Sequence, residues 1–254
     1  MLRAPGLVQT LWTVPAALLL VLAFAAPARP ESAPSDPALA HTVLSPKFDG
    51  KSSRMHRFRV RLAEVRSEIT DLGFERPVSA SLEDAMLAIN GGYWEWHRGK
   101  PRMIGWVVSN GTQLSPLRTK LDGGVLIVQQ ARARIARSAG LSAKPQGIEL
   151  AVQCRPRLVE SGKVVPDLNT QGRAARTAVC VRDGGRTLDA YLSEPRDRSP
   201  TLAELGQWLA AEGCTDALNL DGGPSTAAAY RGSDNVLKVG PGVFLPYSIR
   251  FLPR

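Results

Sequence analysis

Hydrophobic and polar residues alternate, or apolar residues run together, in several short stretches of this chain. Between residues 57 and 62, Phe58, Val60 and Leu62 alternate with arginines, which predicts a strand with a core face and a basic face. Similar patterns predict strands at residues 104–108, 125–130, 148–154 and 217–220. The chain is therefore expected to be rich in short strands.

Turn residues separate several of these stretches. Asn110-Gly111 is a strong signal for a two-residue hairpin turn. Glu-Ser-Gly at 160–162 and Asp-Gly-Gly at 183–185 have the composition of hairpin turns as well. Strands joined by such turns pair in antiparallel fashion, so most of the predicted sheet is antiparallel.

Two segments have the start signal of a helix. Residues 201–204 (Thr-Leu-Ala-Glu) match a capping box, and an apolar face follows before Gly213, which predicts a helix ending there. Residues 81–84 (Ser-Leu-Glu-Asp) match the same box and predict a second, short helix. These elements together predict an α+β fold: a single domain with a mixed, mostly antiparallel sheet core and a few flanking helices.

The N-terminus has the pattern of an export signal. No charged residue lies between Arg3 and Arg29, and the apolar core Leu11–Ala26 precedes the small-x-small site that ends at Ala28. We expect residues 1–28 to be a signal peptide that is cleaved after Ala28, leaving no stable membrane span. The competing interpretation is an uncleaved anchor, although the apolar core is short for a span. The predicted location is outside the cytoplasm, periplasmic or secreted.

The remaining chain divides by composition. Residues 29–55 are rich in Pro, Ser and Ala without apolar periodicity, which predicts a linker or flexible arm. Residues 56–254 carry the predicted strands and are expected to form the folded domain. A total length of 254 residues, 44% of them hydrophobic and 22% charged, is typical of an ordinary globular protein.

Charge and cysteines limit the possible partners and cofactors. The net charge of +9 is spread over scattered arginines, without a basic tail or a nucleic-acid-binding motif, so nucleic acid is not an expected partner. Cys154, Cys180 and Cys214 allow one disulfide with a spare thiol, or three buried thiols. No C-x-x-C spacing is present, which argues against a zinc or redox motif.

Two segments share an unusual form: an apolar run, an Asn, then paired glycines. They are AINGGYW at 88–94 and LNLDGGPST at 218–226. Paired glycines permit left-handed backbone and close approach of the chain to a neighbour or a ligand. Each segment alone is explained as well by a turn, and neither fits a phosphate-binding P-loop or a dinucleotide-binding fingerprint.

Two further segments make the pattern specific. VQCRPRLVESGKVV at 152–165 and RAARTAVCVRDGG at 173–185 lie between the glycine-rich ones. With these four segments in order, the sequence resembles the phosphodiester glycosidase family over roughly residues 56–250. The resemblance implies catalytic roles for Asp221, Arg176 and Asn90. It implies substrate-binding roles for Gly91, Gly92, Thr177, Asn219, Gly222 and Gly223.

The chemistry of a glycosyl phosphodiester explains these residue types. The leaving phosphate monoester is a weak base, so the usual pair of carboxylates is not required. An arginine can bind the phosphate in bidentate fashion, and a carboxylate can stabilise the sugar cation or activate water. Arg176 and Asp221 suit these two roles, and Asn90 and Asn219 suit hydrogen bonding to sugar hydroxyls. A divalent cation such as Ca²⁺ at Asp221 is a further possibility, while no cofactor is certain.

Each of these residues also has a purely structural interpretation. Arg176 fits a solvated charge at a strand edge, and Asp221 and Asn90 fit turn residues. Trp94, Trp96 and Trp106 fit core packing as well as stacking on a sugar. The family's pattern usually has Ser-Gly where this chain has Cys154-Arg155, and a third Gly where it has Pro224.

The sequence therefore supports one main hypothesis and two rivals. The main hypothesis is an exported hydrolase of sugar-1-phosphodiesters in envelope or extracellular polysaccharide metabolism, whose partner is a phosphorylated or phosphodiester-linked glycan. The first rival is a noncatalytic envelope module that binds phosphorylated glycan, favoured by Arg155 and Pro224. The second rival is a glycosidase that uses a pair of carboxylates on neutral glycosides.

Overall fold

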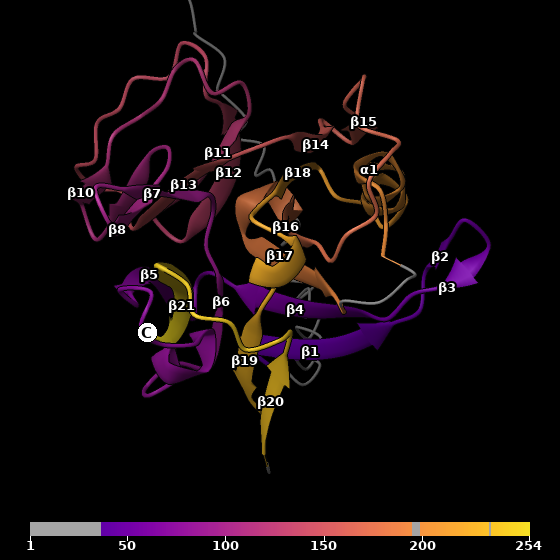
Figure 1. The fold of residues 1–254 in the computed structure, drawn as a ribbon, viewed down its shortest axis with the longest axis horizontal. Coiled ribbons are helices and arrows are strands. Elements are labelled where there is room, and N and C mark those ends of the chain that lie inside the picture. The colour runs from indigo at the N-terminus through magenta and orange to yellow at the C-terminus, as the bar shows by residue number, and fades with distance from the viewer. Residues whose placement is uncertain (1–36, 195–198, 234) are drawn as a thin grey trace, which may run out of the picture. The chain divides into compact units, whose positions relative to one another are not determined.

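Three antiparallel sheets make up most of the fold (Figure 1), in a computed structural model that describes residues 37–194, 199–233 and 235–254. The largest sheet has seven strands, and its order begins with β1 at one edge and ends with β15 at the other. In spatial order the strands are β1 (Leu39–Leu44), β4 (Met55–Arg61), β17 (Thr187–Ser193), β16 (Thr177–Arg182), β18 (Asp216–Asn219), β14 (Arg157–Glu160) and β15 (Lys163–Val164).

The other two large sheets have five strands each. One consists, in order, of β10 (Thr112–Ser115), β9 (Val107–Ser109), β13 (Leu150–Cys154), β11 (Gly124–Gln129) and β12 (Arg132–Arg137). The other consists of β20 (Val236–Val239), β19 (Ala228–Arg231), β6 (Leu87–Asn90), β21 (Tyr247–Pro253) and β5 (Val65–Asp71). Two small hairpins complete the strands, β2 (Lys47–Phe48) with β3 (Lys51–Ser52) and β7 (Trp94–His97) with β8 (Lys100–Met103).

One core joins the three sheets. Phe58 of β4, Val179 of β16, Leu126 of β11 and Ile89 of β6 all belong to the same cluster of buried side chains. In β4 the buried side chains of Phe58 and Val60 alternate with partly exposed arginines, as the period of two predicts. Burial of this apolar surface against neighbouring sheets is the main stabilising contribution to the fold.

Several predicted elements are confirmed. Asn110 and Gly111 both have positive φ, 48° and 76°, and join β9 to β10 as a tight hairpin turn. Helix α1 (Leu202–Ala211) begins at the predicted capping box, in which the Thr201 side chain accepts from the Glu204 N–H. The chain leaves this helix through Gly213, whose φ is +83°.

The expectation of a few flanking helices is wrong, and the fold is closer to mostly-β. Within the described residues α1 is the one α-helix, beside short 3₁₀ turns at Val78–Ser81, Asp183–Gly185 and Gly223–Ser225. The second capping box opens no helix because the Ser81 hydroxyl donates to the Val78 carbonyl instead. A few residues later the chain forms strand β6, whose four residues are all buried and which lies between β19 and β21.

The expectation of a linker over residues 29–55 is wrong for its second half. β1 lies within that range and pairs in register with β4, from Leu39 opposite Val60 to Leu44 opposite Met55. Leu39 is buried in the main core, so this strand belongs to the folded domain. The predicted signal peptide at 1–28 lies outside the described residues. In the described part of the chain, no helix has the length and apolar character needed to cross a bilayer.

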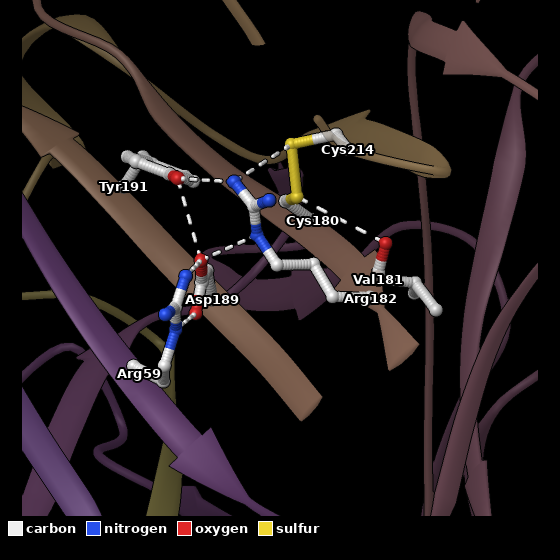
Figure 2. Close-up of a disulfide and its surroundings, with 7 residues drawn as sticks. All are labelled: Arg59, Cys180, Val181, Arg182, Asp189, Tyr191 and Cys214. Carbon is white, nitrogen blue, oxygen red and sulfur yellow. Dashed lines mark hydrogen bonds and ion pairs between the residues drawn. A yellow bond between two sulfur atoms is a disulfide. The ribbon is translucent and has the colours of Figure 1, made fainter. Parts of the chain in front are cut away.

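A disulfide settles the alternatives left open for the cysteines. Cys180 of β16 is bonded to Cys214, just before β18 (Figure 2). Cys154 is a free, buried thiol. Beside the disulfide, the fully buried carboxylate of Asp189 accepts from Arg59 and Arg182, at 2.9 and 2.7 Å. The disulfide and this ion-pair cluster tie together the central strands of the seven-stranded sheet.

Candidate active site

The ends of three strands bring the predicted site residues together. β16 and β18 pair in antiparallel fashion, so Thr177 at the start of β16 lies beside the end of β18. The Leu220 N–H donates to the Thr177 carbonyl at 2.9 Å, which continues this ladder past β18. The next residue, Asp221, donates its N–H to the carbonyl of Gly91 at 3.3 Å, just past the end of β6. Three segments distant in sequence therefore meet at one point.

Asn90 is the centre of this junction. Its amide Nδ2 donates to the carbonyls of Asp221, at 2.9 Å, and Gly91, at 3.1 Å. Its Oδ1 accepts from the Thr177 hydroxyl at 2.7 Å and from the Ala227 N–H at 3.1 Å. The side chain is buried and all its hydrogen bonds go to the protein. Asn90 thus fixes the backbone on both sides of the site.

The glycines after Asn90 make room for a protein side chain. A Cβ atom on Gly91 would lie 2.1 Å from the ring of Tyr247, so only glycine fits there. The Gly92 N–H donates to the Tyr247 hydroxyl at 2.7 Å, and burial raises the pKa of that hydroxyl. Both glycines are buried. Their close neighbour is therefore the aromatic ring of Tyr247, which sequence analysis did not identify.

The glycines after Asp221 differ from each other. A Cβ on Gly222 would lie 2.8 Å from the Ala175 carbonyl oxygen, so this glycine allows the loop to approach the segment leading into β16. Gly223 donates its N–H to the same carbonyl at 2.7 Å and has a φ of +59°. Nothing lies within 4 Å of the position that a Cβ on Gly223 would take, so its α-carbon borders open space.

The carboxylate of Asp221 is partly exposed and held by its own turn. Oδ1 accepts from the Gly222 N–H at 2.9 Å, and the Ser225 side chain donates to the same group. Burial raises the pKa of Asp221 above its ordinary value, and these two hydrogen bonds oppose the rise. A carboxylate with a raised pKa beside open space is suited to accept a proton.

Arg176 lies next to this turn. The α-carbon of Arg176 is 3.7 Å from the Cβ position of Gly222, and its guanidinium donates from Nη2 to the carbonyl of Gly172 at 2.7 Å. No carboxylate of the described residues forms an ion pair with it, whereas Arg59 and Arg182 both pair with Asp189. Burial accordingly lowers the pKa of Arg176. A half-buried cation without a carboxylate can hold an anionic ligand.

The charges of Asp221 and Arg176 both act on the hydroxyl of Tyr93, a residue that sequence analysis did not assign to the site. Its hydroxyl donates to the carbonyl of Arg155 at 2.8 Å. Burial raises its pKa to about 12, with contributions from Cys154 and Asp221, while Arg155 and Arg176 act in the opposite direction. The sequence feature that could have identified Tyr93 is its position directly after the paired glycines Gly91 and Gly92.

The side chain of Asn219 binds the loop that contains Arg155. Its Nδ2 donates to the carbonyls of Arg155, at 3.0 Å, and Leu220, at 2.7 Å. The residue is only 3% exposed, and its Oδ1 is buried without a hydrogen-bond partner among the described residues. Asn219 therefore holds the loop at Arg155 in place.

The nine predicted residues thus form two layers. The buried layer holds backbone in place and consists of Asn90, Gly91, Gly92, Thr177 and Asn219. The partly exposed layer consists of Arg176, Asp221, Gly222 and Gly223. Only the second layer can touch a ligand directly.

Other polar and aromatic candidates have structural partners. Glu95 is in ion pairs with Arg102 and Arg118. Trp106 is 1% exposed and its indole N–H donates to Gln113 at 3.0 Å, so it is a core residue. No group of three or more His, Cys, Asp or Glu side chains within the described ranges is arranged to hold a metal ion.

Comparison with known proteins agrees with this arrangement. A sequence model of the phosphodiester glycosidase family matches residues 83–243, which includes every residue of both layers. A search of the curated proteins gives no match.

Solved structures share the fold at low sequence identity. The catalytic domain of zebrafish N-acetylglucosamine-1-phosphodiester alpha-N-acetylglucosaminidase, auto-inhibited by its pro-peptide, superposes with a TM-score of 0.66 at 15% identity, covering 87% of this chain and 86% of that chain. A hypothetical protein from Synechocystis gives 0.63 at 16% identity, with 85% of this chain and 62% of that chain covered. A putative exported protein from Burkholderia pseudomallei gives 0.61 at 13% identity, with coverages of 80% and 74%.

Proposed function

Because this chain belongs to the phosphodiester glycosidase family, we propose that it is an exported hydrolase that cleaves a sugar-1-phosphodiester at the anomeric bond. The observation that carries the proposal is that the backbone of Arg176 lies against the Asp221–Gly223 turn, while its half-buried guanidinium has no carboxylate partner among the described residues. The guanidinium suits the phosphate and the Asp221 carboxylate suits the sugar. We propose a role in envelope or extracellular polysaccharide metabolism.

The proposed reaction breaks the bond between the anomeric carbon and the phosphate oxygen. The electron pair of that bond leaves with the phosphate monoester, whose growing charge Arg176 stabilises. Water adds to the anomeric carbon, and the Asp221 carboxylate accepts its proton. The products are a free sugar and a phosphate monoester. Asp221 also stabilises the positive charge that develops on the sugar ring.

The buried layer has a positioning role in this proposal. Asn90 binds the Asp221 carbonyl and the Thr177 hydroxyl, and Thr177 immediately follows Arg176. It therefore ties the backbone at Asp221 to the residue that follows Arg176, without touching the substrate. Gly91 and Gly92 let Tyr247 support the same backbone. Asn219 holds the loop at Arg155. Gly222 lets the turn pack against Ala175, and Gly223 lets substrate approach the turn.

The second candidate is a noncatalytic module that binds phosphorylated glycan. Arg155 and Pro224 are both exposed near the site, at positions where the family's pattern usually has glycine. Arg155 adds a second positive charge close to Tyr93, and Pro224 lacks an N–H that could bind an oxyanion. Arg155 therefore favours retention of an anion, and the missing N–H of Pro224 disfavours the stabilisation of developing charge that turnover requires.

The test is a screen of the purified mature chain against sugar-1-phosphodiesters, nucleotide sugars included, and against neutral aryl glycosides. Release of free sugar and phosphate monoester from a phosphodiester, with no release from neutral glycosides, is the expected result. Binding of the phosphodiester without release would support the noncatalytic module. Turnover of neutral glycosides alone would refute both.

Export has its own test. The mature N-terminus is expected at Arg29, after the small residues Ala26 and Ala28. N-terminal sequencing of protein from the periplasm or medium would show this end. A chain that keeps Met1 and sediments with membranes would show an anchor instead.

A further inference from the structure

A second hollow lies outside the candidate active site. It has a volume of about 520 Å³ and lies between the end of β5, the β7–β8 hairpin and the segment before β21. The residues that matter for its chemistry are Asp71, Phe74, Glu75, Trp96, Lys100 and Pro246. The volume is in the range of small-molecule sites. None of the residues assigned to the active site lines it.

Trp96 gives this pocket an exposed aromatic surface. It is 58% exposed, which is the largest fraction among the exposed large hydrophobic side chains of the described residues. Its ring centroid lies 5.2 Å from that of Phe74 and 5.9 Å from that of Trp94, in edge-on contacts. Phe74 and Trp94 are themselves 4.7 Å apart. These contacts hold the indole in one orientation, so little side-chain entropy is lost when a ligand stacks on it.

The backbone under Trp96 is also constrained. Arg98 and Gly99 have φ values of 50° and 75°, as in a tight two-residue hairpin turn. Trp96 lies opposite Pro101 across the hairpin, whose fixed ring stiffens the second strand. A binding surface on a stiff hairpin keeps its shape without ligand.

Most of the polar side chains that line the pocket accept hydrogen bonds, so they favour a ligand that donates them. Asp71 and Glu75 contribute two carboxylates, and neither forms an ion pair within the described ranges. One Asp71 oxygen accepts from the Gly73 N–H at 2.8 Å, which leaves its other oxygen for a ligand. Lys100 is the one cation among the lining residues, so the lining has a net charge of −1, from two acids and one base.

These groups match one class of ligand. A pyranose ring presents C–H bonds on one face, which pack on the negative face of an aromatic ring, and hydroxyl groups at its edge, which donate to carboxylates. A phosphate would meet a net negative lining and is disfavoured. The pocket therefore has the opposite preference to the anion-binding Arg176 in the candidate active site.

Two chain segments connect the pocket with that site. Tyr93 of the site precedes Trp94 of the aromatic cluster, and Pro246 of the pocket precedes Tyr247, which supports Gly92. The Leu72 N–H donates to the Pro246 carbonyl at 2.7 Å and fixes the pocket wall to the same segment. The pocket and the candidate site are therefore built on the same two backbone segments.

We propose that this pocket binds a neutral pyranose unit of a glycan, separate from the sugar that carries the phosphodiester. Its place in substrate recognition rests on the proposed function, whereas sugar binding by the pocket does not. In a substrate with both features, the phosphodiester lies at Arg176 and the neutral unit stacks on Trp96.

The experiment is an NMR titration of the whole mature chain, following the indole N–H of Trp96. The probes are methyl glucopyranoside, methyl mannopyranoside, methyl galactopyranoside, N-acetylglucosamine and the neutral disaccharides of these sugars. At least one probe should shift the resonance with a millimolar dissociation constant, as expected for a small ligand on one aromatic platform. Glucose 6-phosphate should shift it less than glucose does.

Variants identify the surface that binds. Trp96→Ala should weaken the binding of that probe ~10-fold or more, because the stacking surface is lost. Glu75→Gln should weaken it less, since an amide still accepts from a hydroxyl. Phe244→Ala is the matched control: Phe244 is 50% exposed and does not line the pocket, so binding should not change. For the alanine variants, binding is measured by ligand-observed NMR.

The outcomes separate this inference from the proposed function. If the chain binds a sugar at the pocket but hydrolyses no phosphodiester, the sugar-binding inference stands and the proposed hydrolase activity is refuted. If the chain hydrolyses a phosphodiester but the Trp96 resonance responds to no probe, sugar binding by the pocket is refuted and the proposed hydrolase activity stands. Binding that Trp96→Ala leaves unchanged, or a stronger response to glucose 6-phosphate than to glucose, would also overturn the assignment.

Discussion

Replacing Asn90 with alanine tests the junction of the three strand ends. The substitution removes an amide that is 1% exposed and makes hydrogen bonds to Asp221, Gly91, Thr177 and Ala227. An alanine fits the strand, so the change removes hydrogen bonds without adding a clash.

The expected magnitude follows from the groups left behind. Asn90→Ala leaves the Thr177 hydroxyl, the Ala227 N–H and the Asp221 carbonyl without their partner in a buried region. Each buried group that loses its hydrogen bond costs about 1 kcal/mol or more, so the free energy of unfolding should fall by roughly 3 kcal/mol. Since Asn90 also fixes the backbone at Asp221, turnover of the phosphodiester should fall together with stability.

The assay is urea denaturation, with turnover measured at a temperature where the variant is folded. Asn169→Ala is the control, because Asn169 is exposed and its side chain accepts only from the nearby Gln171 N–H at 2.7 Å. It should cost less than about 1 kcal/mol. Thr177→Val, which removes one donor to Asn90, should lie between the two. Equal losses for Asn90→Ala and Asn169→Ala would show that the junction contributes little, and the positioning argument would be refuted.

Four further predictions concern the exposed layer and the disulfide. Arg176→Lys should raise KM for the phosphodiester ~10-fold or more, because lysine lacks the planar fork, and unchanged kinetic constants would remove the phosphate role. Asp221→Asn should lower kcat ~10²-fold or more if the carboxylate acts on the reacting atoms, and a fully active variant would contradict that role. Because burial raises the pKa of Asp221, this carboxyl should destabilise the native chain relative to Asp221→Asn, and increasingly so as pH rises from the ordinary carboxyl pKa through the raised one. Urea denaturation of both chains across this range measures the difference, and a variant that gains no relative stability with pH would contradict it. Replacing Cys180 and Cys214 with alanine opens a loop of 34 residues and should cost about 4 kcal/mol in denaturation experiments; a loss below about 1 kcal/mol would contradict the loop-closure argument.

Local sequence signals predicted the fold where nothing else competed for the same residues. The capping box at Thr201 forms because the following ten residues have one apolar face that packs on β14, and α1 results. The same signature at Ser81 fails because Leu87–Asn90 is needed as a central strand, with β19 on one side and β21 on the other. The short interval after Ser81 leaves no room for a helix. Tertiary pairing, absent from any local window, decides between the two outcomes.

The sequence predicted which segments form the candidate site, but not which residues contact one another within it. The four family-like segments located Asn90, Arg176 and Asp221, and the structure brings all three to one junction. The sequence did not indicate that Gly91 makes room for Tyr247, because 156 positions separate them and an aromatic residue near the C-terminus has many possible partners. For the same reason the distinction between a buried layer and an exposed layer needed coordinates.

The junction at Asn90 also constrains the order in which the chain can become functional. Its partners Thr177, Asp221 and Ala227 lie 87, 131 and 137 residues away along the chain, and Tyr247 lies 155 residues from Gly92. Contacts between such distant residues form late and slowly during folding, because long loops must close first. A chain that emerges from its N-terminus cannot assemble the site until almost its whole length is available. If the protein is exported unfolded and has the proposed activity, hydrolysis can begin only after transport is complete, so the topology of the fold itself would protect substrates in the producing compartment.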